Sequence, residues 1–138
     1  MSLIVLDASV AVRLYVAHPD TAAAQRLAVE SECISPGLVR LEMANALRRY
    51  VQAGIVSSFD ARRALAHVEQ TVRVVSETTE MALSALEIAL EHSHSVYDCC
   101  YLALALNDRA ALATADRKLA ALAGKLGIPV VKLEPAQR

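Results

Sequence analysis

A chain of 138 residues with 55% apolar and 21% charged side chains fits one domain with a real core, and this composition excludes an intrinsically disordered protein. The formal net charge of −1 argues against nonspecific binding of long duplex DNA, because phosphate contacts need an excess of lysine and arginine. Three cysteines, of which Cys99 and Cys100 are adjacent, fit no disulfide framework. With no signal-peptide pattern at the start and no apolar run of ~18 residues, we expect a cytoplasmic protein.

The apolar pattern predicts short strands that alternate with helices along the whole chain. The strands are predicted at residues 3–6, 33–35, 72–75, 111–114 and 130–133. The helices are predicted at 9–16, 21–30 (with Asp20 as its cap), 38–53, 57–70, 78–91, 95–106 and 116–125, and Gly54 and Gly127 are expected to end two of them. This alternation predicts an α/β sandwich with a mostly parallel central sheet.

Four acidic residues stand where they could share one site. Asp7 ends the first predicted strand and Asp116 follows a later one, so a parallel sheet would bring both to the same edge. Asp98 lies in the first turn of a helix that is apolar nearly all round, where a carboxylate needs a partner or a metal. Glu42 lies near a helix start, where the helix dipole favours its ionised form. Together they predict an oxygen-rich site for a hard cation such as Mg²⁺ or Mn²⁺.

Each acid also has a purely structural interpretation. Asp7 and Asp116 could cap the helices that follow them, and Asp98 could complete a capping box with Ser95. Glu42 could favour its helix dipole and pair with a neighbouring arginine, Arg40 or Arg49.

The central arginines are candidates for phosphate contacts. Arg48, Arg49, Arg62 and Arg63 fall in one stretch of the chain, whereas the next predicted helix is rich in glutamate. The alternative is that these arginines form an ordinary solvated face.

Four segments together resemble the acidic motifs of the PIN-domain family. They are Ile4-Val5-Leu6-Asp7-Ala8-Ser9, Glu42-Met43-Ala44-Asn45-Ala46-Leu47, the segment from Val96 to Ala105 that contains Asp98, and Ala113-Thr114-Ala115-Asp116-Arg117-Lys118-Leu119. Their order and spacing are similar to those of VapC-like toxin ribonucleases from bacterial toxin–antitoxin pairs, over essentially all of residues 1–138 as a single PIN domain. The pair Cys99-Cys100 departs from the family, which more often has small or aliphatic residues there.

The resemblance implies a function and a set of roles. Asp7, Glu42, Asp98 and Asp116 would bind Mg²⁺ or Mn²⁺ and hydrolyse RNA endonucleolytically. Ser9, Asn45 and Thr114 would support the site. The protein would be a homodimer, silenced by an antitoxin protein that places a basic side chain into the acidic pocket.

Other functions fit the sequence less well. A phosphatase with an aspartyl nucleophile needs a second Asp two positions after Asp7, where Ser9 stands, and a receiver domain needs a pair of acids at the first strand. A PIN-like module that only receives a partner's basic side chain remains the alternative to an enzyme. A zinc site built from Cys99 or Cys100 with His92 or His94 matches no common ligand spacing, and we expect the histidines at surface positions and helix ends.

Overall fold

The structure, a computed structural model described here for residues 1–134, alternates strands and helices as the sequence predicts. The strands are β1 (Ser2–Leu6), β2 (Ser31–Pro36), β3 (Arg73–Val75), β4 (Ala111–Ala113) and β5 (Val130–Val131). The helices are α1 (Ala8–Arg13), α2 (Thr21–Glu30), α3 (Leu38–Gln52), α4 (Ser58–Thr71), α5 (Thr79–His92), α6 (Val96–Asp108) and α7 (Arg117–Lys125).

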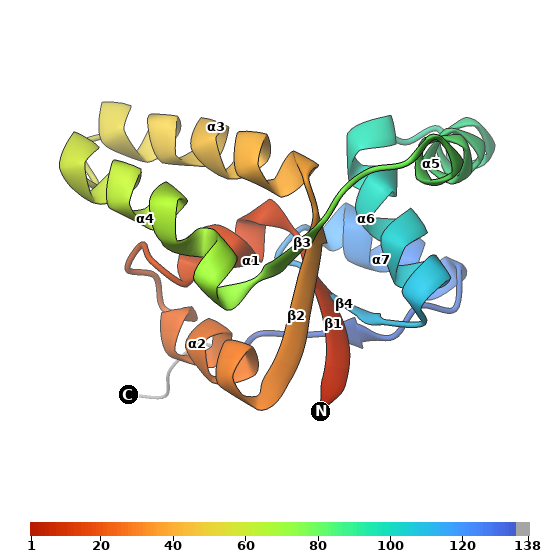
Figure 1. Cartoon of the computed structure of the whole chain (residues 1–138), viewed down its shortest axis with the longest axis horizontal. Coiled ribbons are helices and arrows are strands. Elements are labelled where there is room, and N and C mark those ends of the chain that lie inside the picture. The colour runs from red at the N-terminus through yellow and green to blue at the C-terminus, as the bar shows by residue number, and fades with distance from the viewer. Residues whose placement is uncertain (135–138) are drawn as a thin grey trace.

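The five strands form one sheet in the order β3-β2-β1-β4-β5, and every pairing is parallel. Helices cover both faces of this sheet. Figure 1 shows it nearly edge-on, with α1 to α4 on one side and α5 to α7 on the other. The expected α/β/α sandwich is therefore confirmed, and its sheet is wholly rather than mostly parallel.

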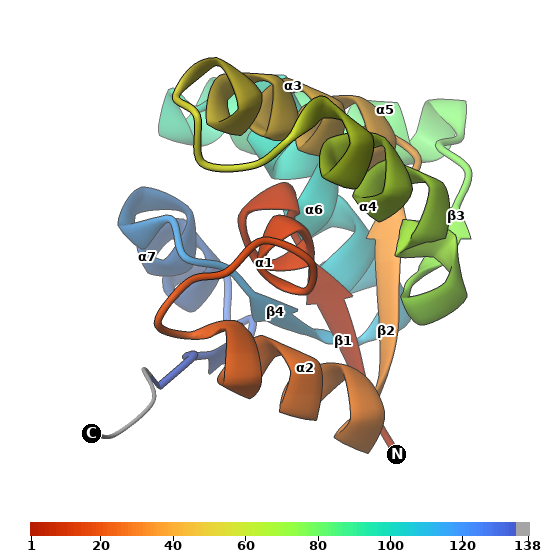
Figure 2. The same cartoon turned by 90° about the vertical axis from the view of Figure 1, so that its left-hand side faces the viewer.

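The most buried helix is the one whose sequence is apolar nearly all round. Every residue of α6 from Cys99 to Ala105 is buried. This helix packs across β1, β2 and β4, whose core residues Val5, Ile34 and Leu112 have no exposed surface. Figure 2 shows α6 behind the sheet and α1 in front of it, so the central strands are enclosed on both faces. Such enclosure explains why these strands read as apolar runs without alternation.

Element ends differ from the predictions where tertiary pairing decides them. Strand β2 is longer than expected because Ser31 to Ile34 pair with β1, and β5 keeps only two residues. Asp20 precedes α2 but its side chain makes no capping hydrogen bond, so that prediction is wrong; its carboxylate turns to Arg13 and His18 instead. Within residues 1–134 no helix is both long enough and apolar enough to cross a membrane.

Candidate active site

The direction of chain connections reverses between β1 and β4, which are neighbours in the sheet. From β1 the chain runs through α1 and α2 to β2, whereas from β4 it runs through α7 to β5 on the other side. In open parallel sheets, the crevice beyond the carboxyl ends of two such strands is the usual place for a ligand. Asp7 follows β1 and Asp116 lies just beyond β4, so both carboxylates stand at this crevice.

A hollow of about 320 Å³ opens at that point and all four predicted acids line it. Asp7 and Asp116 come from the strand ends, Glu42 from the second turn of α3, and Asp98 from the first turn of α6. We call this space the acidic hollow. Ser9 and Asn45 also line it, whereas Thr114 reaches the site only through its hydrogen bonds.

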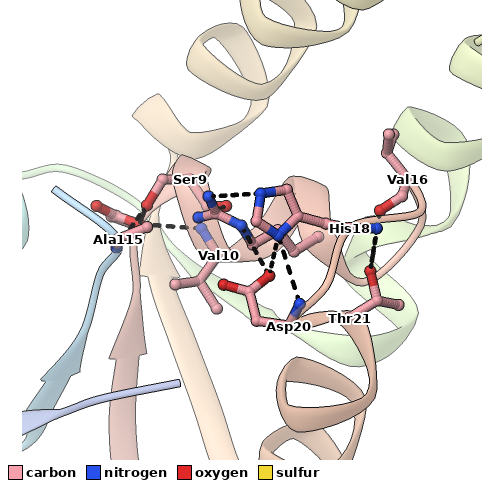
Figure 3. Close-up of polar contacts among 9 residues, drawn as sticks. Ser9, Val10, Val16, His18, Asp20, Thr21 and Ala115 are labelled. Atoms are coloured by element: carbon pink, nitrogen blue, oxygen red, sulfur yellow. Dashed lines mark hydrogen bonds and ion pairs between the residues drawn. The ribbon is translucent and has the colours of Figure 1, made fainter. Parts of the chain in front are cut away.

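Asp7 is the most constrained of the four acids. The residue is 5% exposed, and its carboxylate accepts hydrogen bonds from Ser9 Oγ at 2.5 Å, from the Val10 backbone N–H at 3.1 Å and from Thr114 Oγ1. It therefore caps α1, as its structural interpretation predicts, and it also faces the acidic hollow. Ser9 Oγ in turn accepts the Ala115 N–H at 2.9 Å, a contact visible in Figure 3, so the ends of β1 and β4 are linked through side chains.

Glu42 is held from the side of the core. The phenol of Tyr101, a fully buried residue of α6, donates a 2.6 Å hydrogen bond to Glu42 Oε1. The alternative pairing of Glu42 with Arg40 or Arg49 is not formed among the described residues, and Arg40 binds Glu69 at 2.8 Å instead. A hydrogen bond from the core leaves Glu42 Oε2 free of partners among the described residues.

The other two acids are also held through one oxygen each. His94 Nε2 lies 3.1 Å from Asp98 Oδ2, and the Asp98 N–H bonds Ser95 Oγ at 3.4 Å, so only half of the expected capping box forms. Asp116 Oδ1 accepts the N–H groups of Lys118 and Leu119, which makes it the cap of α7. Among residues 1–134, Asp98 Oδ1 and Asp116 Oδ2 have no hydrogen-bond partner.

Burial and repulsion from neighbouring acids both raise the pKa of Asp7 and of Glu42. Burial raises the pKa of Asp7, and the charge of Asp116 adds to this, although the bonds from Ser9, Thr114 and Val10 act in the opposite direction. Burial likewise raises the pKa of Glu42, with Tyr101 opposing and Asp98 and Asp7 adding. A positive charge in the acidic hollow would relieve both effects.

The donors of the acidic hollow suit a hard divalent cation that keeps part of its water shell. The acidic side chains that line it are all carboxylates, the ligand type that Mg²⁺ and Mn²⁺ prefer. As the side chains stand in residues 1–134, no three His, Cys, Asp or Glu groups are arranged to hold a metal ion. Mg²⁺ commonly binds through one or two carboxylates and several waters, and the residues that could hold it here are Glu42, Asp98 and Asp116, each with one free carboxylate oxygen among the described residues.

The cysteine–histidine alternative finds no support in this part of the chain. Cys99 and Cys100 are both buried in α6, and the nearest sulfur partner of Cys100 is Met81 Sδ at 3.7 Å. Burial, with smaller contributions from Glu77 and Glu42, raises the pKa of the Cys100 thiol to about 11, which disfavours the thiolate that zinc requires. Both residues act as core packing.

The predicted arginines do not lie together. Arg49 alone of the four lines the acidic hollow. Arg48 turns away and bonds Asn45 and Gln52, and Arg62 and Arg63 line separate hollows along α4. The four arginines therefore do not share one hollow, although Arg48 and Arg62 line the same hollow between α3 and α4, and their role as phosphate contacts stays a prediction.

Three residues near the acids were missed by sequence reasoning. Tyr101 looked like one more core residue of an apolar helix, and His94 looked like a surface position at a helix end. Arg13 lines the acidic hollow from α1 and bonds the Ser9 carbonyl at 3.1 Å. A signal existed only for Tyr101, since a buried phenol usually has a hydrogen-bond partner.

Comparison with known proteins shows to which family the chain belongs. The family model described as PIN domain matches residues 4–125. The chain belongs to the PIN domain family. A curated relative, Ribonuclease VapC3 from Pyrobaculum aerophilum, is 31% identical over 120 residues, which cover 85% of this chain and 92% of that protein.

Solved structures of other proteins share the fold of this chain. The Mycobacterium tuberculosis toxin VapC20, which cleaves the sarcin-ricin loop, matches with a TM-score of 0.70 and 20% identity over 86% of this chain and 93% of that one. VapBC2 from Rickettsia felis, bound to a DNA fragment of its promoter, gives a TM-score of 0.71 and 13% identity over 96% and 99% of the two chains. The resemblance drawn from the four acidic motifs is thus confirmed at the level of the family, and the roles of the individual acids remain predictions.

Proposed function

We propose that this PIN domain is a metal-dependent endoribonuclease that hydrolyses RNA phosphodiester bonds at the acidic hollow. The observation that carries the proposal is the convergence of Asp7, Glu42, Asp98 and Asp116, from four separate elements, on one hollow at the switch point of the sheet. The 31% identity to a ribonuclease over most of the chain supports the same reaction.

The four acids would hold Mg²⁺ or Mn²⁺, with Asp7 fixed by Ser9 and Thr114 and with Glu42 fixed by Tyr101. The ion would lower the pKa of an attacking water and neutralise charge on the phosphate. The chain's own contribution is to place the carboxylates side by side and to fix their orientation through second partners.

The test compares the wild type with Asp98→Asn on total RNA, with Mn²⁺ or with a chelator. We expect cleavage only by the wild type and only with metal. Thermal unfolding gives an independent readout: Mn²⁺ at about 100 times its Kd stabilises the folded protein by about 2.7 kcal/mol, or roughly 10 °C in Tm, and Asp98→Asn should reduce this shift. Cleavage that survives in Asp98→Asn would contradict the assignment of the site.

The alternative is a PIN domain that binds without cutting. In that case a partner's lysine or arginine would occupy the acidic hollow, and purified protein would show neither cleavage nor a metal-dependent rise in Tm. The 31% identity to Ribonuclease VapC3 favours the enzyme.

We also propose an antitoxin as the protein partner, since a toxin–antitoxin complex from Klebsiella pneumoniae is among the similar structures. A basic side chain of the antitoxin would enter the acidic hollow and compete with metal. The measurement is inhibition of RNA cleavage by the cognate antitoxin and its relief at high Mn²⁺ concentration.

A homodimer is the expected assembly. Leu83, Leu86 and Leu90 on α5 are 55%, 43% and 74% exposed, and their spacing places them on one helix face. Such a stripe is costly in water and typical of an interface. Leu86→Glu with Leu90→Glu should give a monomer by light scattering, whereas the equally exposed Leu41→Glu on α3 should not.

A further inference from the structure

A second hollow, of about 610 Å³, lies directly beside the acidic hollow. The two share Arg13 and Asp116 in their walls, so they are neighbours across these side chains. The second hollow is formed mainly by the start of α7, the loop before it and the strand β5 with the residues that follow. We call it the α7 groove.

The α7 groove carries cations that have no partner elsewhere in the described chain. Arg117 and Lys132 are exposed and form no ion pair or side-chain hydrogen bond with any residue of 1–134. Arg13 is already committed, since its Nε lies 3.0 Å from Asp20 Oδ1. Figure 3 shows Asp20 and His18 turned toward each other, with His18 Nδ1 2.6 Å from Asp20 Oδ1. The Asp20 carboxylate in the wall of the α7 groove therefore also has partners already.

The chemistry of the two hollows is complementary for a phosphate chain. A strand whose phosphodiester lies among four carboxylates has further phosphates on either side, and those phosphates would be repelled unless cations lie just outside. Arg117 and Lys132 lie just outside in one direction, and Arg49 lies at the acidic hollow itself on α3. No other described residue of the α7 groove is cationic besides Arg13.

We propose that the α7 groove holds the RNA strand on one side of the bond to be cut, with Arg117 and Lys132 contacting its backbone phosphates. The proposal rests on the ribonuclease function argued above. The described residues that line the groove include no aromatic ring on which a base could stack. The contacts are therefore to the backbone, and the groove binds strands of different sequence equally well.

The test measures binding of labelled oligo(U) and oligo(A) by fluorescence anisotropy, in an Asp98→Asn background that prevents cleavage. Arg117→Ala with Lys132→Ala should raise Kd about 5- to 30-fold near 0.1 M salt, equally for both RNAs. Loss of two phosphate contacts should also reduce the slope of log K against log salt by about 1.4. Arg13 is not replaced, because its loss would leave the Asp20 carboxylate without its arginine partner.

The matched control is Arg26→Ala with Lys125→Ala, which removes the same charge from exposed positions that line neither hollow. We expect this control to bind within about twofold of the parent. An equal loss of affinity in the control, or an unchanged Kd in the groove variant, would overturn the proposal. Thermal unfolding of both variants shows whether the fold is intact.

Cleavage kinetics separate this proposal from the function on which it rests. In the metal-active protein, Arg117→Ala with Lys132→Ala should raise KM and leave kcat nearly unchanged, because the groove binds substrate and transition state alike. A wild type that cleaves RNA while the groove variant keeps its KM and Kd overturns the groove alone. A wild type that neither binds nor cleaves RNA overturns both.

Discussion

The phenol of Tyr101 points from the middle of α6 into the acidic hollow and donates a hydrogen bond of 2.6 Å to Glu42 Oε1. The two residues are 59 positions apart in the chain. Burial, reinforced by the charge of Glu42, raises the pKa of this phenol, so it remains a donor throughout the working range of pH. Tyr101 is therefore placed to orient Glu42 by donating this hydrogen bond.

Replacing Tyr101 by Phe should lower metal affinity and RNA cleavage about 10-fold while the ring still fills its place in the core. The reason is that groups which orient metal ligands typically contribute 10- to 100-fold to affinity or activity. Tyr97→Phe on the same helix is the control, because Tyr97 is 66% exposed and its hydroxyl has no partner among the described residues. Mn²⁺ titration by calorimetry and cleavage assays check the prediction, and equal activity of the two variants would rule out the orienting role.

The charge of Asp7 should cost the metal-free protein stability at neutral pH. Its pKa is raised in the folded chain, so the folded state binds this proton more tightly than the unfolded state does. Stability from this group is therefore greatest below the unfolded pKa of about 3.9 and falls as pH rises through the folded pKa.

Asp7→Asn removes that cost and keeps an oxygen to accept the Val10 N–H. In the presence of a chelator we expect its Tm to equal or exceed that of the wild type at pH 7, with the difference shrinking toward pH 4. The same variant should lose RNA cleavage. A Tm well below the wild type at pH 7 would show that the hydrogen bonds of Asp7 outweigh its desolvation.

Arg49 and its neighbour Arg48 offer a matched pair for the acidic hollow. Arg49 lines the hollow, whereas Arg48 does not line it and instead bonds Asn45 and Gln52. Arg49→Ala should reduce kcat/KM for RNA about 5- to 30-fold, and Arg48→Ala should change it less than about twofold. Equal effects would show that total charge matters rather than position at the hollow.

The sequence predicted the half of the site that depends on strands better than the half that depends on helices. Asp7 and Asp116 could be placed together because parallel strands bring their carboxyl ends to one edge, whatever the loops do. The approach of Glu42 and Asp98 depends on how α3 and α6 cross that edge, which no local pattern encodes. For those two acids the family resemblance supplied the grouping.

The positions of the cations were harder still to predict. Arg48 and Arg49 are adjacent in sequence, yet one faces the acidic hollow and the other does not, because the helix rotates by about 100° per residue. Arg13 pairs with Asp20, which lies in the loop after α1. The sequence predicted Asp20 as a helix cap and so gave no sign of this ion pair. The orientation of a helix about its own axis decides such cases, and it is fixed only by packing.

Arg13 should contribute to stability through its pair with Asp20. The two side chains are 16% and 12% exposed, with Arg13 Nε 3.0 Å from Asp20 Oδ1, so the carboxylate left by Arg13→Ala would be largely buried with only His18 beside it. We expect a loss of about 2–4 kcal/mol in the free energy of unfolding, and Arg13→Ala with Asp20→Ala should recover part of it.

The exposed pair Arg73–Glu32, at 3.3 Å and with side chains 58% and 55% exposed, is the control for that comparison. Its coupling energy should stay below about 1 kcal/mol, because water screens both charges. Urea unfolding of the two double-mutant cycles measures both values under the same conditions. Similar coupling in the two pairs would mean that Arg13 and Asp20 are solvated together, and Arg13 would then be free to turn toward a phosphate in either hollow.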